Sequence, residues 1–587
     1  MKVKKIAVLA FILLAVLLCT ACGELVDTIA STDFGTKIEI QESGSIDDVK
    51  LRDNPLLYEN SDPAEVVTMY LTVSEGNSAE NTNHTWTEIN TYSVYDYERM
   101  GIDRYQVNGL LQIGDDKKLL EGELGYGQIS PNCTVQIRGQ TSSSAPQKNY
   151  KISIKDNKGS WRGQTTIALN KHYSDGLRFR NKLAYDLIAG IDEMMGLRTT
   201  FVHLYVKDTT EGGNGVFVDY GLYTQVEQLN KTALKAHGLD KNGHLYKINL
   251  CEFYRYEESI KLKDDPTYDL EAFEEILEIK GSDDHEKLIE MLQKVNDYSI
   301  PIDTILEEHF DIENMSYWMG FQILMGNIDT QSRNFYIYSP LNSEKWYFIA
   351  WDNDGALKRA EYELNGRIDY SGWESGISNY WGNILFRRCL KSEKYIAALD
   401  SAIEDLMGYL TEDRIESMVS SYKTIAKPYV YRLPDRMYAP LTEKDYDTVA
   451  SSVSSEIAIN YQLYKDSFNK PMPFFISVPE RNGDMLMLTW DNSYDFDAET
   501  ITYTFELAKD YNFNEIIVKQ ENILLPEAEF DLLPEGQYFI RVTARNTSGY
   551  EQYAFDYYII DSGKVYGTKC FYVDADGNIV EDIYVEG

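Results

Sequence analysis

The chain has 587 residues, a length that indicates about three or four domains. It contains 56 Lys and Arg residues against 94 Asp and Glu residues, which gives a formal net charge of −38 at pH 7. Because this charge repels a polyanion, the composition argues against nucleic acid as the main partner. The 45 tyrosines supply aromatic side chains for β structure.

The N-terminal 22 residues have the pattern of a signal peptide. A basic start, MKVKK, precedes a short apolar run at 6–18, and small residues follow it. Ala21 before Cys22 resembles a bacterial lipoprotein box, although Cys19 stands where that motif usually has Leu. We therefore expect 1–22 to be a lipoprotein signal peptide and Cys22 to carry a lipid that anchors the protein to a membrane face. The alternative is secretion without a lipid.

Residues 23–63 are polar and acidic, which is typical of a flexible tether. Alternation of apolar and polar residues then predicts a β-rich region that extends to about residue 170. Its first predicted strands are 65–73, 85–96 and 105–115.

The period changes at Leu177, after which apolar residues recur at helical spacing as far as Ile191. Strands are predicted again at 200–208 and 215–230. A mostly helical region follows, with helices predicted at 269–280, 284–298, 315–327 and in a block at 392–470.

Residues 474–560 return to short alternating runs, which predict a β-sandwich. This stretch resembles a fibronectin type III module, with Trp490 as the buried aromatic residue. Leu532, Pro534 and Tyr538 match a tyrosine corner, in which the Tyr hydroxyl bonds to nearby backbone. A generic β-sandwich is the alternative. Residues 561–587 predict a C-terminal hairpin and tail.

The cysteines outside the signal region form neither a disulfide framework nor a zinc pattern, because they are widely separated. We expect buried thiols, or at most one long-range disulfide. They are Cys133, Cys251, Cys389 and Cys570.

The stretch NIDTQSRNFYIY, residues 327–338, has the spacing of a phosphotransfer site. Asp329 precedes Asn334 by five residues, as the catalytic Asp precedes the metal-binding Asn in protein kinases. A predicted hairpin then leads to Asp352 and brings it back beside Asn334. The spacing alone is weak, because Asp and Asn are common in loops, so a structural loop is the alternative.

Ordered motifs over residues 120–390 make this stretch more specific. Together they resemble the spore-coat protein H (CotH) kinase family, which are atypical kinases of the secretory pathway. The motifs, in the order of the family, are RGQTSSSAPQKNYKISIKD, LRFRNKLAYDL, YGLYTQVEQLN, GNIDTQSRNFYIY and FIAWDNDGAL.

The resemblance implies a role for each acidic position. Asp329 would be the catalytic carboxylate that faces the acceptor hydroxyl, while Asn334 and Asp352 would hold Mg²⁺ or Mn²⁺ with the phosphates of ATP. Asp354 is either a second metal ligand or a turn cap, and we favour the ligand because the family shows two Asp residues there.

A glycine-rich loop of the conventional kinase type is absent from the sequence. RGQTSSS, between two predicted strands, offers backbone N–H groups, hydroxyl groups and a positive charge to phosphates. The residues we assign to nucleotide binding in it are Arg138, Gly139, Ser142 and Ser143. A solvated Ser-rich hairpin is the alternative.

The phosphate lysine is expected on the following strand, with Lys151 preferred over Lys148. Both could equally be surface charges of an edge strand. The usual glutamate partner is missing, because the helix after Leu177 carries only Glu193, near its end. Glu227 is a candidate for a ribose or lysine contact, or a plain carboxylate at a strand end.

We expect an α+β protein in which an atypical, bilobal protein-kinase-like domain at 64–470 precedes the all-β sandwich. The domain would be β-rich in its N-terminal part and helical in its C-terminal part. The predicted activity is transfer of the ATP γ-phosphate to Ser or Thr of an extracytoplasmic spore-coat or cell-surface protein, with Mg²⁺ or Mn²⁺. The alternative is a catalytically silent, surface-anchored binding or scaffold protein that acts through its β-sandwich.

Overall fold

A computed structural model describes residues 50–59, 61–364, 373–560 and 563–582. The predicted signal peptide, Cys22 and most of the predicted tether lie outside the described residues. Within those ranges, no helix is long and apolar enough to cross a membrane. The fold mixes helices with several sheets, which confirms the expected α+β class.

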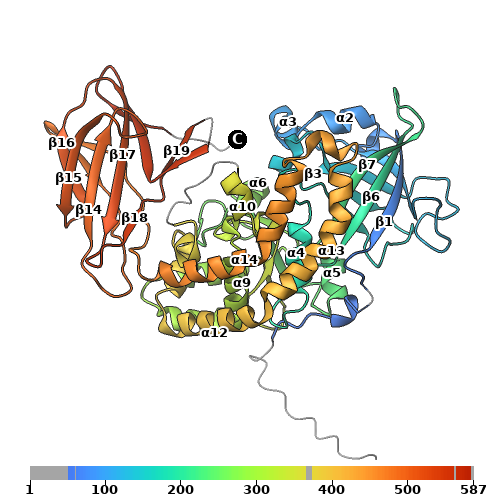
Figure 1. Cartoon of the computed structure of the whole chain (residues 1–587), viewed down its shortest axis with the longest axis horizontal. Helices are drawn as coiled ribbons and strands as arrows, with labels where there is room; N and C mark the ends of the chain where they lie inside the picture. The colour runs from blue at the N-terminus through green and yellow to red at the C-terminus, as the bar shows by residue number, and fades with distance from the viewer. Residues whose placement is uncertain (1–49, 60, 365–372, 561–562, 583–587) are drawn as a thin grey trace, which may run out of the picture. The chain divides into compact units, whose positions relative to one another are not determined.

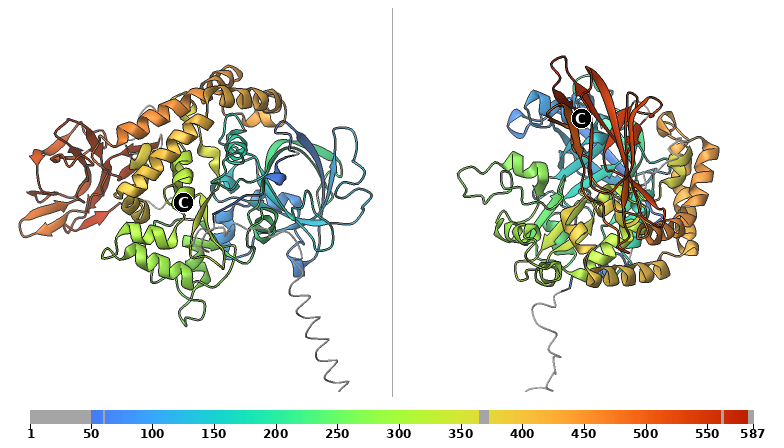
Figure 2. Two further views of the ribbon diagram at one scale, coloured as in Figure 1. Left: turned by 90° about the horizontal axis from the view of Figure 1, so that it is seen from below. Right: turned by 90° about the vertical axis from the view of Figure 1, so that its left-hand side faces the viewer.

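The N-terminal part is a closed β-barrel, whose strands curve around a shared interior (Figures 1 and 2). It closes because β1 pairs with β2 on one side and lies parallel to β6 on the other. Alternate residues of each strand are buried, so Met69, Leu71 and Val73 fill the interior. In barrel order the strands are β1 (Val66–Ser74), β2 (Val107–Gly114), β3 (Cys133–Arg138), β4 (Asn149–Ile154), β5 (Thr166–Asn170), β7 (Phe217–Glu227) and β6 (Thr199–Asp208).

The strand predicted at 85–96 is wrong, because two short helices, α2 (Trp86–Thr91) and α3 (Val94–Met100), occupy it. Each begins with a capping box, in which a Thr or Ser and an acidic residue three positions on satisfy each other's backbone N–H groups. The acidic partners are Glu88 and Asp96. These caps outweigh the alternation of polar and apolar residues.

The middle of the chain folds into a second sheet with helices around it. Its strand order is β11 (Tyr347–Ala350), β10 (Phe335–Ser339), β8 (His244–Ile248) and β9 (Leu277–Ile279). The stretch predicted as one helix at 269–280 is therefore helix only at α6 (Leu270–Ile276) and continues as β9.

The helices share one large apolar core with this sheet. Figure 1 shows the longer ones, α12, α13 and α14. The bounds are α4 (Arg180–Ile188), α5 (Lys231–Ala236), α7 (Glu286–Asn296), α8 (Ile302–His309), α9 (Ile312–Leu324), α10 (Arg359–Leu364), α11 (Ile384–Cys389), α12 (Glu393–Tyr409), α13 (Glu412–Val430) and α14 (Glu443–Ser467).

The C-terminal part is all β, with a separate apolar core that contains Trp490. Tyr538 donates its hydroxyl to the Pro534 carbonyl over 2.9 Å, the bond expected of a tyrosine corner. One sheet is β12 (Glu480–Asn482), β13 (Met485–Thr489) and β16 (Glu527–Asp531). The other contains β15 (Ile516–Ile523), β14 (Thr502–Ala508), β17 (Gly536–Arg545), β18 (Glu551–Tyr553), β21 (Thr568–Val573) and β22 (Ile579–Glu581), beside a separate hairpin of β19 (Tyr557–Ile560) and β20 (Gly563–Tyr566).

The sandwich extends beyond the predicted boundary at residue 560, because β21 pairs with β17 and β22 with β21. The predicted terminal hairpin thus forms part of the same sheet. The fibronectin type III resemblance stays a prediction. The four described cysteines are buried and free, so no long-range disulfide joins them.

Residues after Lys50 pack into the fold, although they were assigned to the tether. Leu51 is buried in the large core, and Asp53 accepts hydrogen bonds from the Tyr58 hydroxyl at 2.7 Å and the Gly196 N–H at 3.0 Å. Asp53 also contacts His237 Nδ1 at 2.5 Å. The end of the predicted tether is therefore an ordered segment that packs against the helical part.

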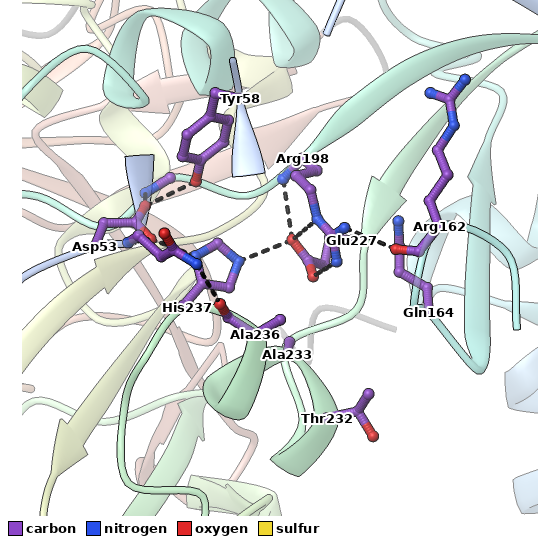
Figure 3. Close-up of polar contacts among 12 residues, drawn as sticks. Asp53, Tyr58, Arg162, Gln164, Arg198, Glu227, Thr232, Ala233, Ala236 and His237 are labelled. Carbon is purple, nitrogen blue, oxygen red and sulfur yellow. Dashed lines mark hydrogen bonds and ion pairs between the residues drawn. The ribbon is translucent and has the colours of Figure 1, made fainter. Parts of the chain in front are cut away.

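His237 lies between two carboxylates, as Figure 3 shows. Its Nε2 is 2.9 Å from Glu227, which is itself 2.5 Å from Arg198. Burial opposes charge on His237, but hydrogen bonds to Asp53 and Glu227 raise the pKa of His237 to about 9. Burial opposes charge on Glu227 as well, yet His237 and Arg198 lower the pKa of Glu227 to about 2.

We predict that this network makes stability fall at alkaline pH. The pKa of His237 lies above its unfolded value of about 6.5, so its contribution is complete below that pH and is lost as pH rises through about 9. The loss amounts to about 3 kcal/mol. Between about pH 6 and pH 9.5, the melting temperature should fall more for the wild type than for His237→Gln, which cannot titrate. Parallel curves for the two proteins would contradict the assignment.

Candidate active site

The loop after α9 places Asp329 in a short 3₁₀ turn, Ile328–Thr330. Gly326 ends the helix with a φ of +60°, and a Cβ there would lie 2.7 Å from the Asn460 amide of α14. Asn327, which is buried, donates to Gln322 of α9 over 3.0 Å. The close approach requires glycine, and the entry to the loop is fixed on both sides.

Side chains of the following segment hold the same loop from its other face. Asn379 donates to the Ile328 carbonyl over 3.1 Å, and Asn383 donates to the Gln331 carbonyl over 2.9 Å. The hydroxyl groups of Thr330 and Tyr380 are 2.8 Å apart. Backbone carbonyls on both sides of Asp329 are thus tied down, while its carboxylate stays exposed to solvent.

The hairpin β10–β11 brings Asn334 and Asp352 to one end of the sheet, as the sequence predicted. Phe335 pairs with Ala350, so Asn334 and Trp351, the residues just outside the pair, meet there. Both Asn334 and Asp352 have positive φ, +62° and +54°, which short polar side chains tolerate. The left-handed turns redirect each side chain at the strand end.

Helix α4 fixes the turn that begins at Asp352. The Asp352 N–H donates to the Tyr185 hydroxyl over 3.1 Å, and the Asn353 N–H donates to the Asn181 amide oxygen over 3.0 Å. Arg180, fully buried, donates from Nε to the Leu357 carbonyl over 2.8 Å. One helix therefore holds both ends of the turn.

Arg180 is itself held by two buried carboxylates. It pairs with Asp175 and, over 2.7 Å, with Glu361 of α10. The Glu361 carboxylate also accepts the Gly176 N–H at 3.2 Å. The charge of Arg180 is matched locally, which a buried cation requires.

The carboxylates of the site act on one another. Burial and the neighbouring Asp354 raise the pKa of Asp352 to about 6, although its side chain keeps access to solvent. Protein atoms crowded around Asp329, which leave one side of it open to solvent, and the charge of Asp354 also raise the pKa of Asp329. Burial opposes ionisation of Asp354, but the His172 ring, with Nδ1 at 3.7 Å, and Lys358 hold the pKa of Asp354 below its usual value.

These oxygens suit a hard divalent cation. In the described part of the chain, the side chains of Asp329, Asn334 and Asp352 have no hydrogen-bond partner. A Cβ at Gly355 would lie 4.0 Å from Asp329 Oδ2, so this loop and the turn are neighbours. Carboxylate and amide oxygens are what Mg²⁺ and Mn²⁺ prefer. The described residues hold no cluster of three or more His, Cys, Asp or Glu suited to a metal.

The cationic side of the site comes from the barrel. Arg138, at the end of β3, donates to Asn170, and its guanidinium lies 5.9 Å from the Trp351 ring centroid. Burial lowers the pKa of Arg138, which the charge of Asp352 opposes. Gly139 has a φ of +91°, and a Cβ there would collide with the Ser142 hydroxyl. Arg138 and Asp352 therefore share one region, as predicted.

Lys151 joins this cationic group. Its pKa is lowered by burial and then by the Lys280 cation, while Glu278 opposes that shift. Within the described ranges its amino group has no hydrogen-bond partner, so it is available to an anion. The residues that the sequence analysis missed here are Arg104, His172, Arg180, Asn181, Tyr185, Lys247, Glu278 and Lys280.

Lys247 was detectable in principle, because it interrupts the apolar strand β8. Its amino group lies 3.7 Å from Glu278, and Asp352 and Arg138 also act on its charge. No local sequence pattern marked Arg104 or Lys280 as site residues, because Arg104 lies in a loop and Lys280 follows the last residue of β9. Glu278, between Lys247 and Lys280, is the carboxylate that this group offers in place of the missing helix glutamate.

Four predicted nucleotide contacts have structural roles instead. Ser143 is buried, and its hydroxyl bonds to the Gln140 carbonyl at 2.6 Å and the Val94 N–H at 2.9 Å. Lys148 donates to the Ser143 carbonyl over 2.6 Å. Glu227 is buried in the network with His237 described above, and Ser142 accepts from Asn149 at 3.0 Å.

The family comparison agrees with the geometry. The family described as CotH kinase protein matches residues 135–464, more than half of the chain. The chain belongs to this family, which confirms the resemblance seen in its motifs, and a kinase-like family implies ATP and a divalent metal as ligands.

Two individual proteins are also similar. The inner spore coat protein H of Bacillus subtilis (strain 168) is 20% identical over 304 residues, which cover 51% of this chain and 78% of that protein. The crystal structure of the proinflammatory kinase CtkA of Helicobacter pylori aligns with 54% of this chain and 94% of its own, at 11% identity. Its TM-score of 0.27 is too low to support an argument from fold.

We predict that Gly355→Ala separates the two halves of the site. A Cβ at this position would lie 2.8 Å from the buried Asn327 oxygen, so the turn and the loop must move apart. The rise in melting temperature produced by ATP with Mn²⁺ should shrink in this variant. Gly408→Ala is the matched control, because a Cβ there meets nothing within 4 Å. Equal shifts in both variants would contradict the close approach.

Proposed function

We propose that the chain is an atypical protein kinase that transfers the γ-phosphate of ATP to a Ser or Thr hydroxyl of an extracytoplasmic protein. One observation carries this proposal. Asn334 and Asp352 lie at the end of one hairpin and Asp329 lies beside the turn that follows it, all with side chains that no described residue satisfies, and the cations Arg138 and Lys151 lie on the barrel side. A scaffold has no use for such a set.

Asp329 would take the proton of the acceptor hydroxyl. Its raised pKa improves it as a proton acceptor, and the exposed carboxylate can reach a bound protein. The acceptor oxygen then forms a bond to the γ-phosphorus while the bond to the β–γ bridging oxygen breaks, which leaves ADP and a phosphorylated hydroxyl.

Asn334, Asp352 and Asp354 would hold the divalent cation. That ion, when bound, neutralises charge on the β- and γ-phosphates. Arg138 and Lys151 would contact phosphate oxygens from the opposite side, Arg138 through its planar guanidinium. The turn of Gly139 lets the chain approach the phosphates closely.

We predict that Asp329→Asn and Asp352→Asn fail for different reasons. Asp329→Asn should keep the melting shift caused by ATP with Mn²⁺ but lose labelled phosphate transfer by about 10²- to 10⁴-fold, the usual worth of a general base. Asp352→Asn should lose both, because it removes a metal ligand. Transfer to the chain itself or to a generic protein acceptor measures activity.

Asp576→Asn is the matched control for that experiment, since Asp576 is exposed on the β21–β22 turn and should change nothing. Undiminished labelling in Asp329→Asn would place the base elsewhere. Absence of labelling in the wild type, together with partner capture that survives both substitutions, would favour the silent scaffold.

We propose an extracytoplasmic location on two grounds. The first 22 residues have a signal-peptide pattern with a lipid-acceptor Cys22. The similar Bacillus subtilis protein is named an inner spore coat protein. The acceptor would then be a coat or cell-surface protein.

We predict that Cys22→Ser releases the protein from the membrane fraction of a producing bacterium. Two acyl chains anchor a protein stably, whereas an unmodified chain has no such hold. Fractionation and labelling with a radioactive fatty acid measure the outcome. Cys133→Ser is the matched control, because Cys133 is buried in the barrel. Membrane retention of Cys22→Ser without label would refute lipid anchoring.

A further inference from the structure

A pocket lies where residues after the helical η7 turn (Gly376–Tyr380) meet loops of the sandwich. It encloses about 500 Å³, with the solvent at its mouth included. Trp381, Arg387 and Lys391 contribute one wall, and Asp491 and Tyr494 contribute another. None of the residues assigned to phosphotransfer lines it, so its chemistry is separate.

The walls of the pocket are aromatic. The rings of Trp381 and Tyr494 stack, with centroids 5.3 Å apart and planes at 30°. Phe475 and Phe555 form a second pair at 4.9 Å, and Phe475 is 45% exposed. Aromatic faces that remain open at a pocket can contact a flat apolar surface of a ligand.

Two cations stand beside these rings. The Lys391 amino group is 4.8 Å from the Tyr494 centroid and 5.3 Å from that of Trp381. Burial and the nearby Arg387 cation lower the pKa of Lys391, so the two positive charges act on each other. Over the described ranges, neither residue forms an ion pair with a carboxylate. In a chain of charge −38, this pair is poised for an external anion.

The mouth of the pocket also carries neutral and acidic hydrogen-bonding groups. Asp491 and Asn492 are exposed, and their side chains have no hydrogen-bond partner among the described residues. Asp491 can accept hydrogen bonds from hydroxyl groups, and Asn492 can both accept and donate. The pocket thus combines aromatic faces, a positive pair and acceptors for hydroxyl groups.

We propose that this pocket binds a saccharide ring that carries one anionic group, either a uronate or a sugar phosphate. The C–H bonds on the apolar face of a sugar ring are partly positive and suit the negative face of Phe475 or Tyr494, while the buried Trp381 supports Tyr494 from behind. Arg387 and Lys391 would hold the anion, and Asp491 would accept from ring hydroxyl groups.

An acidic peptide fits the pocket less well than a sugar acid. It would meet the positive pair, but Asp491 would repel its further carboxylates and its side chains would leave the aromatic faces unused. A neutral sugar would leave Arg387 and Lys391 without a partner. The peptide leaves the aromatic rings without a contact, and the neutral sugar leaves the two cations without one.

Isothermal titration calorimetry of the purified protein tests the proposal with four probes. They are a galacturonate trisaccharide, glucose 6-phosphate, neutral maltotriose and a glutamate hexapeptide. We expect at least one anionic sugar to bind about tenfold or more tightly than maltotriose, because a hydrogen bond to a charged group is worth that much. The two anionic probes distinguish a uronate from a sugar phosphate.

Lys391→Met should weaken that binding by about tenfold, since it removes the charge but keeps a chain of similar length over the rings. Asp491→Ala should weaken the sugar as well, whereas it should strengthen an acidic peptide. Lys465→Met is the matched control, because Lys465 also lies over a ring, 4.3 Å from the Tyr461 centroid, outside the pocket lining.

Equal binding of neutral and anionic sugars, or no binding of either anionic sugar, would overturn the proposal. Preference for the hexapeptide that grows in Asp491→Ala would also overturn it, in favour of peptide binding. Phosphate transfer is not measured in these titrations, so their result is independent of whether the chain is an active kinase.

Discussion

The turn that carries Asp352 and Asp354 depends on the buried Arg180. Asp352 and Leu357, at the two ends of the turn, both have left-handed φ angles, +54° and +52°, which cost about 1–2 kcal/mol each without glycine. Such backbone persists only where the surroundings fix it. Arg180 does so by binding the Leu357 carbonyl while Asp175 and Glu361 neutralise its charge. Loss of the cation would leave two buried carboxylates unpaired, at about 3–5 kcal/mol.

Independent supports hold the two acidic segments close together. Glu456 of α14 accepts the N–H groups of Arg359 and Ala360 at 3.1 and 3.2 Å, which fixes the chain after the turn. Asn379 and Asn383 fix the loop of Asp329 from a different segment. Because hydrogen bonds hold both segments in place, the fold keeps the carboxylates of Asp329, Asp352 and Asp354 close enough to repel one another. The divalent cation that we propose for this site would relieve that repulsion, and the carboxylates are already held in place without it.

The sequence predicted the parts of this site that are local and failed on those that are not. Asn334 and Asp352 could be predicted as neighbours because one hairpin joins them, and strand periodicity was enough to find that hairpin. Asp329 could be predicted from its spacing to Asn334. Glu227 was misread because its partners, Arg198, His237 and Asp53, are distant in sequence. The burial of Ser143 and the approach of Arg104 and Lys280 to the site depend on how separate elements pack, which no local pattern encodes. The strand predicted at 85–96 failed for the opposite reason, since local capping outweighed periodicity.

The charge of the chain constrains how such a site can attract ATP. A net charge of −38 repels a nucleotide at long range, but salt screens exposed charges beyond about 8 Å under physiological conditions. The decisive charges are therefore those within that distance, where Arg138 and Lys247 act on Asp352 and Lys151 acts on Arg138. The cations of this site and its carboxylates cannot both contact phosphate directly. Under the proposed function, a divalent ion between the carboxylates and the phosphates would reconcile them, and we expect nucleotide and metal to bind as one unit rather than in independent steps.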